Sequence, residues 1–139
     1  MTSRPETLHS TQLLKKGPLS VNPADNKPFS GIAADHYHNH QNPFDISKVK
    51  TRETFKHGRK DGLCEEFYEN GRLKFRRNYN NGKRHGRWEW FRKNGQLYIR
   101  GNYKNGKRHG PWERFHSNGQ LQFKGNYKDG KRTRSLRIF

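Results

Sequence analysis

The sequence predicts an all-β protein, an elongated single-layer antiparallel sheet of consecutive β-hairpin repeats with a period of 24 residues. Three observations carry this prediction. Glycines recur every 24 residues, Asn-Gly or Asp-Gly pairs recur at hairpin positions, and the stretches between them alternate apolar and polar side chains. Such repetition indicates an architecture in which each unit packs only on its neighbours.

Three glycine series set the period. They are Gly62, Gly86, Gly110; Gly71, Gly95, Gly119; and Gly82, Gly106, Gly130. Two of the series complete turn signals, which are Asn70-Gly71, Asn94-Gly95, Asn118-Gly119, Asn81-Gly82, Asn105-Gly106 and Asp129-Gly130. Such pairs supply the positive φ that both central residues of a type I′ turn need. We therefore expect six tight hairpin turns.

The segment after the first turn of each unit reads as a half-buried strand. Its apolar face is Leu73-Phe75-Arg77-Tyr79, then Leu97-Ile99-Gly101-Tyr103, then Leu121-Phe123-Gly125-Tyr127, and the residues between them are polar and largely basic. Glycine on the apolar face at 101 and 125 predicts that a neighbouring aromatic ring lies against the backbone. Arg77 departs from this pattern.

The segment before each first turn carries large apolar residues three positions apart. The pairs are Trp88 with Phe91 and Trp112 with Phe115. Because side chains alternate along a strand, this spacing requires either a β-bulge or burial on both faces of the sheet. The spacing alone leaves both explanations open.

The repeat pattern also extends toward both ends of the chain. An earlier unit is expected, with a first strand over 31–37 and an enlarged loop over 38–45, and a last strand is expected around Leu136 and Phe139. Residues 1–18 show no period, so we divide the chain into a flexible N-terminal arm over 1–18 and a repeat domain over 19–139.

The composition fits a thin fold better than a two-layer globule. Hydrophobic residues are 27% of the chain, below the usual proportion of about 45–50%. Aromatic residues reach 13%, which argues against disorder. The single cysteine, Cys64, excludes an intramolecular disulfide, and the sequence offers neither a membrane span nor a secretory signal, so we expect a cytoplasmic protein.

The charge points to a polyanionic partner. The formal net charge is +18, and residues 1–50 hold six of the 30 basic and four of the 12 acidic residues, which leaves +16 on residues 51–139. Arg76, Arg100 and Lys124 recur on the polar strand face, about 9.5 Å apart if they lie two strands apart. The turns add Lys83, Arg84, Lys107, Arg108, Lys131 and Arg132. The alternative is that the charges only keep the strand edges solvated, but that role would favour charges of mixed sign.

Nothing in the sequence favours catalysis or a cofactor. The carboxylates Glu65, Glu89 and Glu113 occupy one position of successive repeats, whereas acid–base chemistry needs a few unique, converging groups. The metal candidate that we weigh is His36, His38 and His40, because alternate residues of a strand share one side. A polar loop is the favoured interpretation of that segment, so we predict no metal site.

The repeat unit resembles a known family. The pattern Gly-x-Trp-x-x-Phe-x-x-Asn-Gly-Gln-Leu-x-x-x-Gly-x-Tyr-x-x-Gly-Lys-x-His-Gly, read from Gly86 to Gly110 and again from Gly110, is similar to the MORN-repeat variant. The resemblance extends over roughly 19–139 and implies an elongated single-layer sheet of MORN-type hairpins. Bacterial proteins of this type are commonly called YwqK-type antitoxins, which implies neutralisation of a toxin by direct binding.

We therefore expect a non-enzymatic binding protein of antitoxin or immunity type. Its expected partner is an acidic, toxin-like protein that docks on the ladder of Arg76, Arg100 and Lys124 and on the aromatics Trp90 and Tyr98. The alternative is a nucleic-acid-binding protein that contacts phosphates without reading sequence. An anionic membrane surface ranks third, and the oligomeric state stays open.

Overall fold

The computed structural model describes residues 6–133, 137 and 138, and within them β-strands dominate. The elements are β1 (Glu6–His9), the 3-10 helix η1 (Ser10–Gln12), β2 (Leu14–Lys16), β3 (Leu19–Val21), β4 (Gly31–His36), β5 (Val49–Lys56), β6 (Arg59–Phe67), β7 (Leu73–Asn80), β8 (Lys83–Arg84), β9 (Gly86–Phe91), β10 (Leu97–Lys104), β11 (Lys107–Arg108), β12 (Gly110–Phe115), β13 (Leu121–Lys128), β14 (Lys131–Arg132) and β15 (Arg137–Ile138). The predicted all-β class is confirmed.

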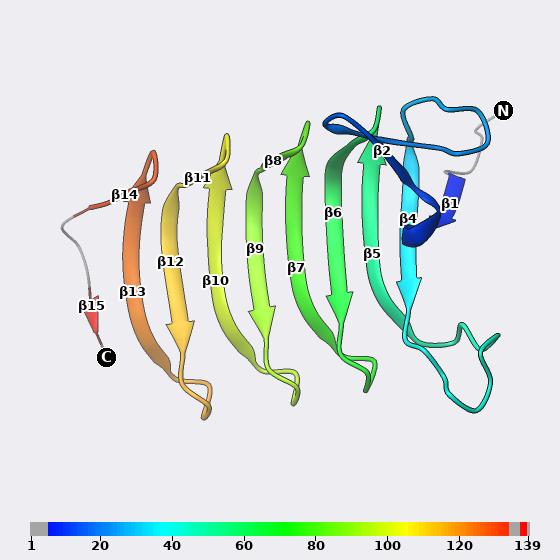
Figure 1. The fold of residues 1–139 in the computed structure, drawn as a ribbon. Helices are drawn as coiled ribbons and strands as arrows, with labels where there is room; N and C mark the ends of the chain where they lie inside the picture. Colours follow the sequence, from blue (N-terminus) through cyan, green and yellow to red (C-terminus); the bar gives the residue numbers. More distant parts are fainter. Residues whose placement is uncertain (1–5, 134–136, 139) are drawn as a thin grey trace, which may run out of the picture.

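Apart from β2 and β3, which pair with each other in a separate antiparallel hairpin, all strands form one long sheet (Figure 1). Its order is β1-β4-β5-β6-β7-β9-β10-β12-β13, and every neighbouring pair is antiparallel except β1 and β4, which are parallel. The short strands β8, β11 and β14 continue the hairpins at one edge, and β15 pairs with β13. The predicted single-layer sheet of consecutive hairpins is confirmed, and most of it has no second layer to cover it.

The two sets of turns differ in conformation. In one set both central residues have positive φ, with values of 49° and 81° at Asn81-Gly82, and Asn105-Gly106, Asp129-Gly130 and His57-Gly58 behave alike. In the other set only the glycine has a positive φ, as at Gly95, where φ is 89°. The prediction of six type I′ turns is therefore wrong for Asn70-Gly71, Asn94-Gly95 and Asn118-Gly119. There the asparagine Oδ1 accepts a hydrogen bond from the backbone N–H two residues later, which holds a longer loop.

A β-bulge in each repeat decides which side chains share a face. Trp90 pairs with Ile99 and Phe91 pairs with Leu97, so Tyr98 is the extra residue. Paired residues lie on the same face, and therefore Leu97 leaves the face that Ile99 occupies. The prediction that Leu97 and Ile99 share one face is wrong, because the sequence carries no sign of the inserted residue. Of the two explanations of the aromatic spacing, packing on both faces holds, because Trp88 and Phe91 lie on opposite faces and the bulge belongs to the partner strand β10.

The register defines two faces that we name for the rest of the description. The aromatic face carries Phe75, Tyr79, Trp88, Trp90, Ile99, Tyr103, Trp112, Arg114, Phe123 and Tyr127. The ladder face carries Arg52, Glu65, Arg76, Glu89, Arg100, Glu113 and Lys124, together with Phe67, Phe91 and Phe115 at its lower end.

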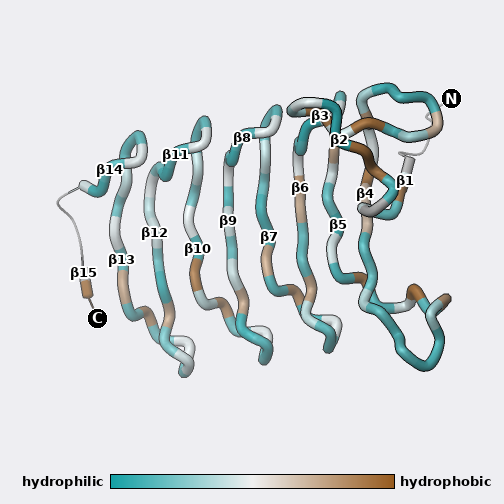
Figure 2. The backbone as a smooth tube through the Cα atoms, viewed as in Figure 1, coloured by the Kyte–Doolittle hydropathy of each residue, from teal (hydrophilic) through white to brown (hydrophobic). Residues whose placement is uncertain are grey.

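The N-terminal segment packs on the first end of the sheet (Figure 1). Phe29, Ala33 and Phe55 form a buried cluster, with Leu8 and Leu13 packed against it. The tube in Figure 2 is brown over parts of this segment and mostly hydrophilic along the repeats. Residues 6–16, which the sequence assigns to the arm, thus lie against β4 and β5 here.

The segment is also hydrogen-bonded to the first hairpin turn. The N–H of Ser20 donates to the carbonyl of Gly58 at 2.8 Å, and the N–H of Gly58 donates to the carbonyl of Phe29 at 2.7 Å. At the opposite end of the sheet Phe123 pairs with Ile138 of β15. Leu136 and Phe139, which the sequence places in the last strand, lie outside the described residues.

Candidate functional site

A ladder of aromatic rings runs along the upper half of the aromatic face. Ring centroids are 5.6 Å apart for Tyr79 and Trp88, 4.6 Å for Trp88 and Tyr103, 5.2 Å for Tyr103 and Trp112, and 6.3 Å for Trp112 and Tyr127. Each tryptophan Nε1 donates to a backbone carbonyl, that of Asn78 for Trp88 and that of Asn102 for Trp112. The rings thereby stabilise one another across strand boundaries.

Gly101 makes this ladder sterically feasible. A Cβ at this position would overlap ring atoms of Trp112, so the expected close approach of an aromatic ring to the backbone is confirmed there. Arg77 occupies the corresponding position one repeat earlier, and its guanidinium lies 5.8 Å from the Trp88 ring centroid. It also donates to Glu66 at 3.5 Å, which offsets the cost of a half-buried charge.

Two arginines of the turns fold back over the aromatic rings. Arg84 lies 4.7 Å from the Tyr103 ring centroid, and Arg108 lies 4.6 Å from that of Trp112. Burial alone would lower the pKa of Arg108, but hydrogen bonds to Tyr103 and Tyr127 raise it on balance, so the group stays charged. Of the six predicted turn cations, Arg84 and Arg108 thus belong to the aromatic face.

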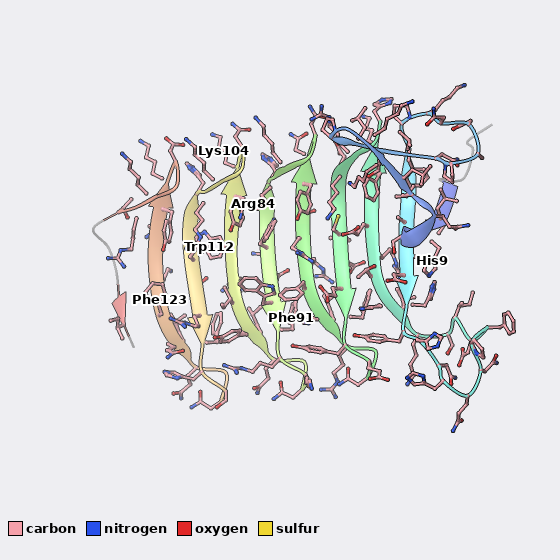
Figure 3. The ribbon with its side chains drawn as sticks, in the orientation of Figure 1. His9, Arg84, Phe91, Lys104, Trp112 and Phe123 are labelled. Atoms are coloured by element: carbon pink, nitrogen blue, oxygen red, sulfur yellow. The ribbon has the colours of Figure 1, made fainter. Side chains whose placement is uncertain are left out.

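A groove opens on the aromatic face between β9 and β13. Its volume is about 230 Å³, and its walls include Trp90, Ile99, Trp112 and Phe123, with Arg114 exposed at its border. Figure 3 shows Trp112 and Phe123 on neighbouring strands of this region. Within residues 86–127, all of which the structure describes, the acids of the strands lie on the ladder face. The groove is therefore lined mainly by apolar and aromatic side chains with arginines beside them, and Glu113, which also lines it, is paired with Arg100.

The ladder face is charge-compensated. Arg76 lies 3.8 Å from both Glu65 and Glu89, and Arg100 lies 2.9 Å from Glu113. Lys124 is the cross-strand partner of Glu113. Arg76, Arg100 and Lys124 do lie on one face two strands apart, as predicted, but a glutamate of the intervening strand stands between successive cations and neutralises much of the row.

The two aromatics assigned to the ladder lie elsewhere. Trp90 points to the aromatic face, where its ring lies 5.2 Å from that of Phe75. Tyr98 is the bulge residue and stacks with Arg92 at 4.4 Å. The recurrence of glutamate at one repeat position, taken with the hairpin register, could have revealed the Glu–Arg pairing, whereas nothing in the sequence marks the bulge.

A set of eight exposed cations lies at one edge of the sheet, which we call the turn edge. Its exposed cations are Lys56, Arg59, Lys83, Lys104, Lys107, Lys128, Lys131 and Arg132. No salt bridge among the described residues involves them, and the acids at this edge are Asp129 and Asp61, whose carboxylate accepts a hydrogen bond from the N–H of Asn81. Figure 3 shows Lys104 at this edge. Four of the six turn cations predicted from the sequence lie here.

The three histidines of the metal candidate are not brought together. Because β4 ends at His36, the other two lie in the loop. His36 stacks with His9 at 5.7 Å, whereas His38 and His40 contact each other at 5.1 Å. Within the part of the chain that the structure describes, no three His, Cys, Asp or Glu side chains are grouped to hold a metal ion.

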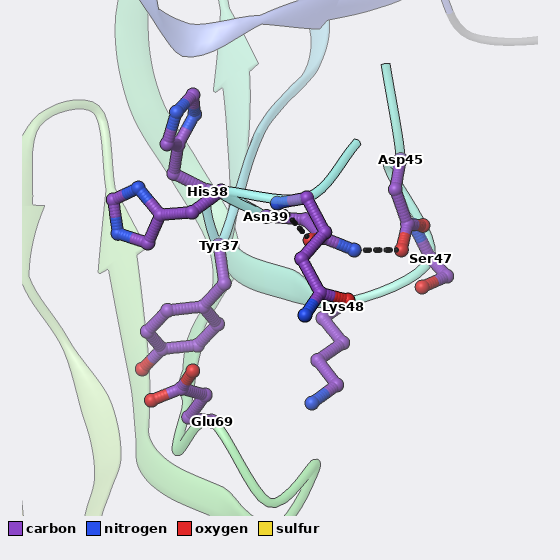
Figure 4. A pocket seen from close by; sticks show the side chains of 9 residues that line it. Tyr37, His38, Asn39, Asp45, Ser47, Lys48 and Glu69 are labelled. Atoms are coloured by element: carbon purple, nitrogen blue, oxygen red, sulfur yellow. Dashed lines mark hydrogen bonds between the residues drawn. The ribbon is translucent and has the colours of Figure 1, made fainter. Parts of the chain in front are cut away.

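The loop after β4 instead forms a polar hollow of about 340 Å³ (Figure 4). Asn39 donates to Asp45 at 2.8 Å, and the N–H of Ser47 donates to the same carboxylate at 2.9 Å. Hydrogen bonds from Ser47 and Asn39 lower the pKa of Asp45 to about 2. These bonds account for the loop conformation without a bound ion.

Cys64 is a buried thiol, and we predict that it is unreactive in the folded protein. Its exposure is 2%, and burial raises its pKa, so the thiolate is suppressed near neutral pH. A disulfide reagent at pH 8 should modify it about 100-fold more slowly than the urea-unfolded chain, because the site must first open. Equal rates in folded and unfolded protein would contradict the packing of β6.

The fold and its surfaces define a class, a β-hairpin repeat protein with one open aromatic face and one basic edge. The family described as MORN repeat variant matches residues 60–81, 84–105 and 108–129, which are three consecutive repeats in the observed 24-residue phase. MORN repeats are commonly protein- or membrane-binding modules and generally non-catalytic scaffolds. No curated protein matches the chain. No helix in the described residues has the length and apolar character of a membrane span.

Proposed function

We propose that this chain is a non-enzymatic binding protein that docks an acidic protein partner on its aromatic face. The observation that carries the proposal is the groove between β9 and β13, where apolar side chains are left without a covering layer. An apolar surface rimmed by polar groups is typical of a protein-interaction site.

The chemistry of the groove supports a protein partner with negative charge. Tryptophan and arginine are the residue types that most often dominate binding energy, and Trp90, Arg108 and Arg114 line the groove. Glu113 also lines the groove, but its carboxylate is paired with Arg100, so Arg108 and Arg114 remain to attract carboxylates of a partner. The ladder face supports docking less, since its glutamates already neutralise most of its cations.

The arrangement of the rings favours a protein over a nucleic acid at this face. Base stacking needs a free aromatic face. Tyr103 and Trp112 instead contact each other, and Arg84 and Arg108 cover their rings. Trp90 and Phe123, which are only partly buried, remain to contact the apolar side chains of a protein partner.

The antitoxin resemblance extends this proposal. The partner would be a toxin-like protein with an acidic surface, and binding to the aromatic face would block its activity without chemistry. No catalytic residue or cofactor is part of the proposal.

Capture from a cell lysate tests it. The immobilised protein, treated with nuclease and washed in steps of rising salt, should retain one acidic protein in stoichiometric amount. Trp90→Ala should lose that protein, because truncation of a central aromatic anchor costs about 2 kcal/mol or more. Retention of nucleic acid alone, or equal capture by Trp90→Ala, would contradict docking at the aromatic face.

A further inference from the structure

The turn edge gathers eight exposed cations in four successive turns, and the proposed protein-binding face does not use them. Its cations belong to successive hairpins, and each hairpin lies one repeat from the next. Two inter-strand spacings separate equivalent turns, so the repeat distance is about 9.6 Å, and the four turns from residue 57 to residue 130 span about 29 Å. The result is a straight line of charge along the sheet.

The hairpins hold this line in a fixed geometry. The backbone N–H of Gly82 donates to the carbonyl of Lys60 at 2.8 Å, that of Gly106 to Arg84 at 2.9 Å, and that of Gly130 to Arg108 at 2.9 Å. Each turn is thereby hydrogen-bonded to the preceding hairpin. The cations are consequently presented at regular intervals by a rigid edge and not by independent loops.

From this arrangement we propose that the turn edge is a second binding site, one that holds the phosphate backbone of a nucleic acid without reading its sequence. One nucleic-acid strand in B-form carries a charge every 3.4 Å, or about eight phosphates over 29 Å. The edge presents eight cations over the same length. The number of cations is therefore comparable with the number of phosphates, and an unpaired strand, which need not wind around a helix axis, can follow the straight edge.

The residue types favour phosphates over a protein surface. Six of the eight cations are lysines, which are depleted at protein–protein interfaces but bind phosphates as compact point charges. The turn tips are Asn-Gly, Asp-Gly or His-Gly, so the edge offers no aromatic anchor. The same tips lack the apolar side chains that would insert into a membrane, and the cations form a line where a membrane presents a plane.

A labelled twenty-residue oligothymidylate, dT20, is a suitable probe. Fluorescence anisotropy should detect binding to the full chain, with a slope of log K against log salt concentration of about −5 if eight phosphates are contacted. Removing three contacts with Lys83→Gln, Lys107→Gln and Lys131→Gln should make the slope shallower by about 2 and weaken binding at least about tenfold near 0.1 M salt.

A matched control removes the same charge from the other edge. Lys48→Gln, Arg72→Gln and Lys93→Gln together change three exposed cations near the opposite turns. This variant should keep affinity for dT20 within about threefold and should keep the wild-type slope. Both variants should retain the wild-type melting temperature, since all six side chains are exposed.

Three results would overturn the site. They are no binding of dT20 at 50 mM salt, equal losses in the two triple variants, or tighter and equally edge-dependent binding of phosphatidylserine vesicles or polyglutamate. The site is independent of the protein-binding face, because Trp90→Ala leaves the turn edge intact. Loss of the captured partner with unchanged dT20 binding would separate the two proposals.

Discussion

Gly101→Ala is expected to destabilise the protein by about 3 kcal/mol, because a methyl group at this position overlaps the indole of Trp112. The ring cannot move away cheaply. It is 7% exposed, its Nε1 donates to Asn102, and Arg108 covers it. Urea unfolding followed by tryptophan fluorescence should show a lower midpoint with the same slope.

A double-mutant cycle separates this clash from a backbone effect. Trp112→Ala alone should cost about 3–5 kcal/mol, as expected for a buried aromatic side chain. In that background Gly101→Ala should cost less than about 0.5 kcal/mol, because the overlapping atoms are gone. Additive losses would mean that glycine is required at position 101 for its backbone conformation and not for the space that it leaves to the Trp112 ring.

Phe29→Ala should be comparably severe, with a loss of about 3–5 kcal/mol in the free energy of unfolding. Phe29 is 1% exposed, and its ring centroid lies 5.9 Å from that of Phe55. Its backbone also bonds to Ser20 and Gly58, so the cavity would loosen the N-terminal segment from the first hairpin. Hydrogen exchange should rise most in β3 to β5.

Phe44→Ala provides the matched control, since it removes the same ring from a site that is 89% exposed. Its effect should stay within about 0.5 kcal/mol. If Phe29→Ala were as mild as Phe44→Ala, the N-terminal segment would not be part of the folded unit.

The repeat could be predicted from the sequence because its signals are local. Glycine spacing, Asn-Gly and Asp-Gly pairs and strand alternation each depend on a few neighbouring residues, and together they gave the period, the hairpins and the single layer. The type I′ conformation holds where asparagine or aspartate adopts positive φ, as at Asn105, and fails where a side-chain hydrogen bond closes a longer loop, as at Asn94.

Which residues occupy each face of the sheet, and how their charges pair, could not be predicted, because both depend on features that the sequence does not display. One bulge residue, Tyr98, moves Leu97 to the opposite face, and alternation alone cannot register it. The Glu89 and Arg76 pairing needs the exact register between hairpins, so the ladder seemed more basic than it is. The fold-back of Arg108 onto Trp112 is a tertiary contact of a turn residue with the next strand, which no local pattern indicates.

The most direct test of the account compares the two faces with one purified partner. Arg114→Glu reverses an exposed charge at the groove on β12, and Arg87→Glu makes the same change on β9 on the ladder face. Titration calorimetry with the captured partner should show at least about tenfold weaker binding for Arg114→Glu, and a change within about threefold for Arg87→Glu. The opposite ranking would place the partner on the ladder face and contradict the proposed function.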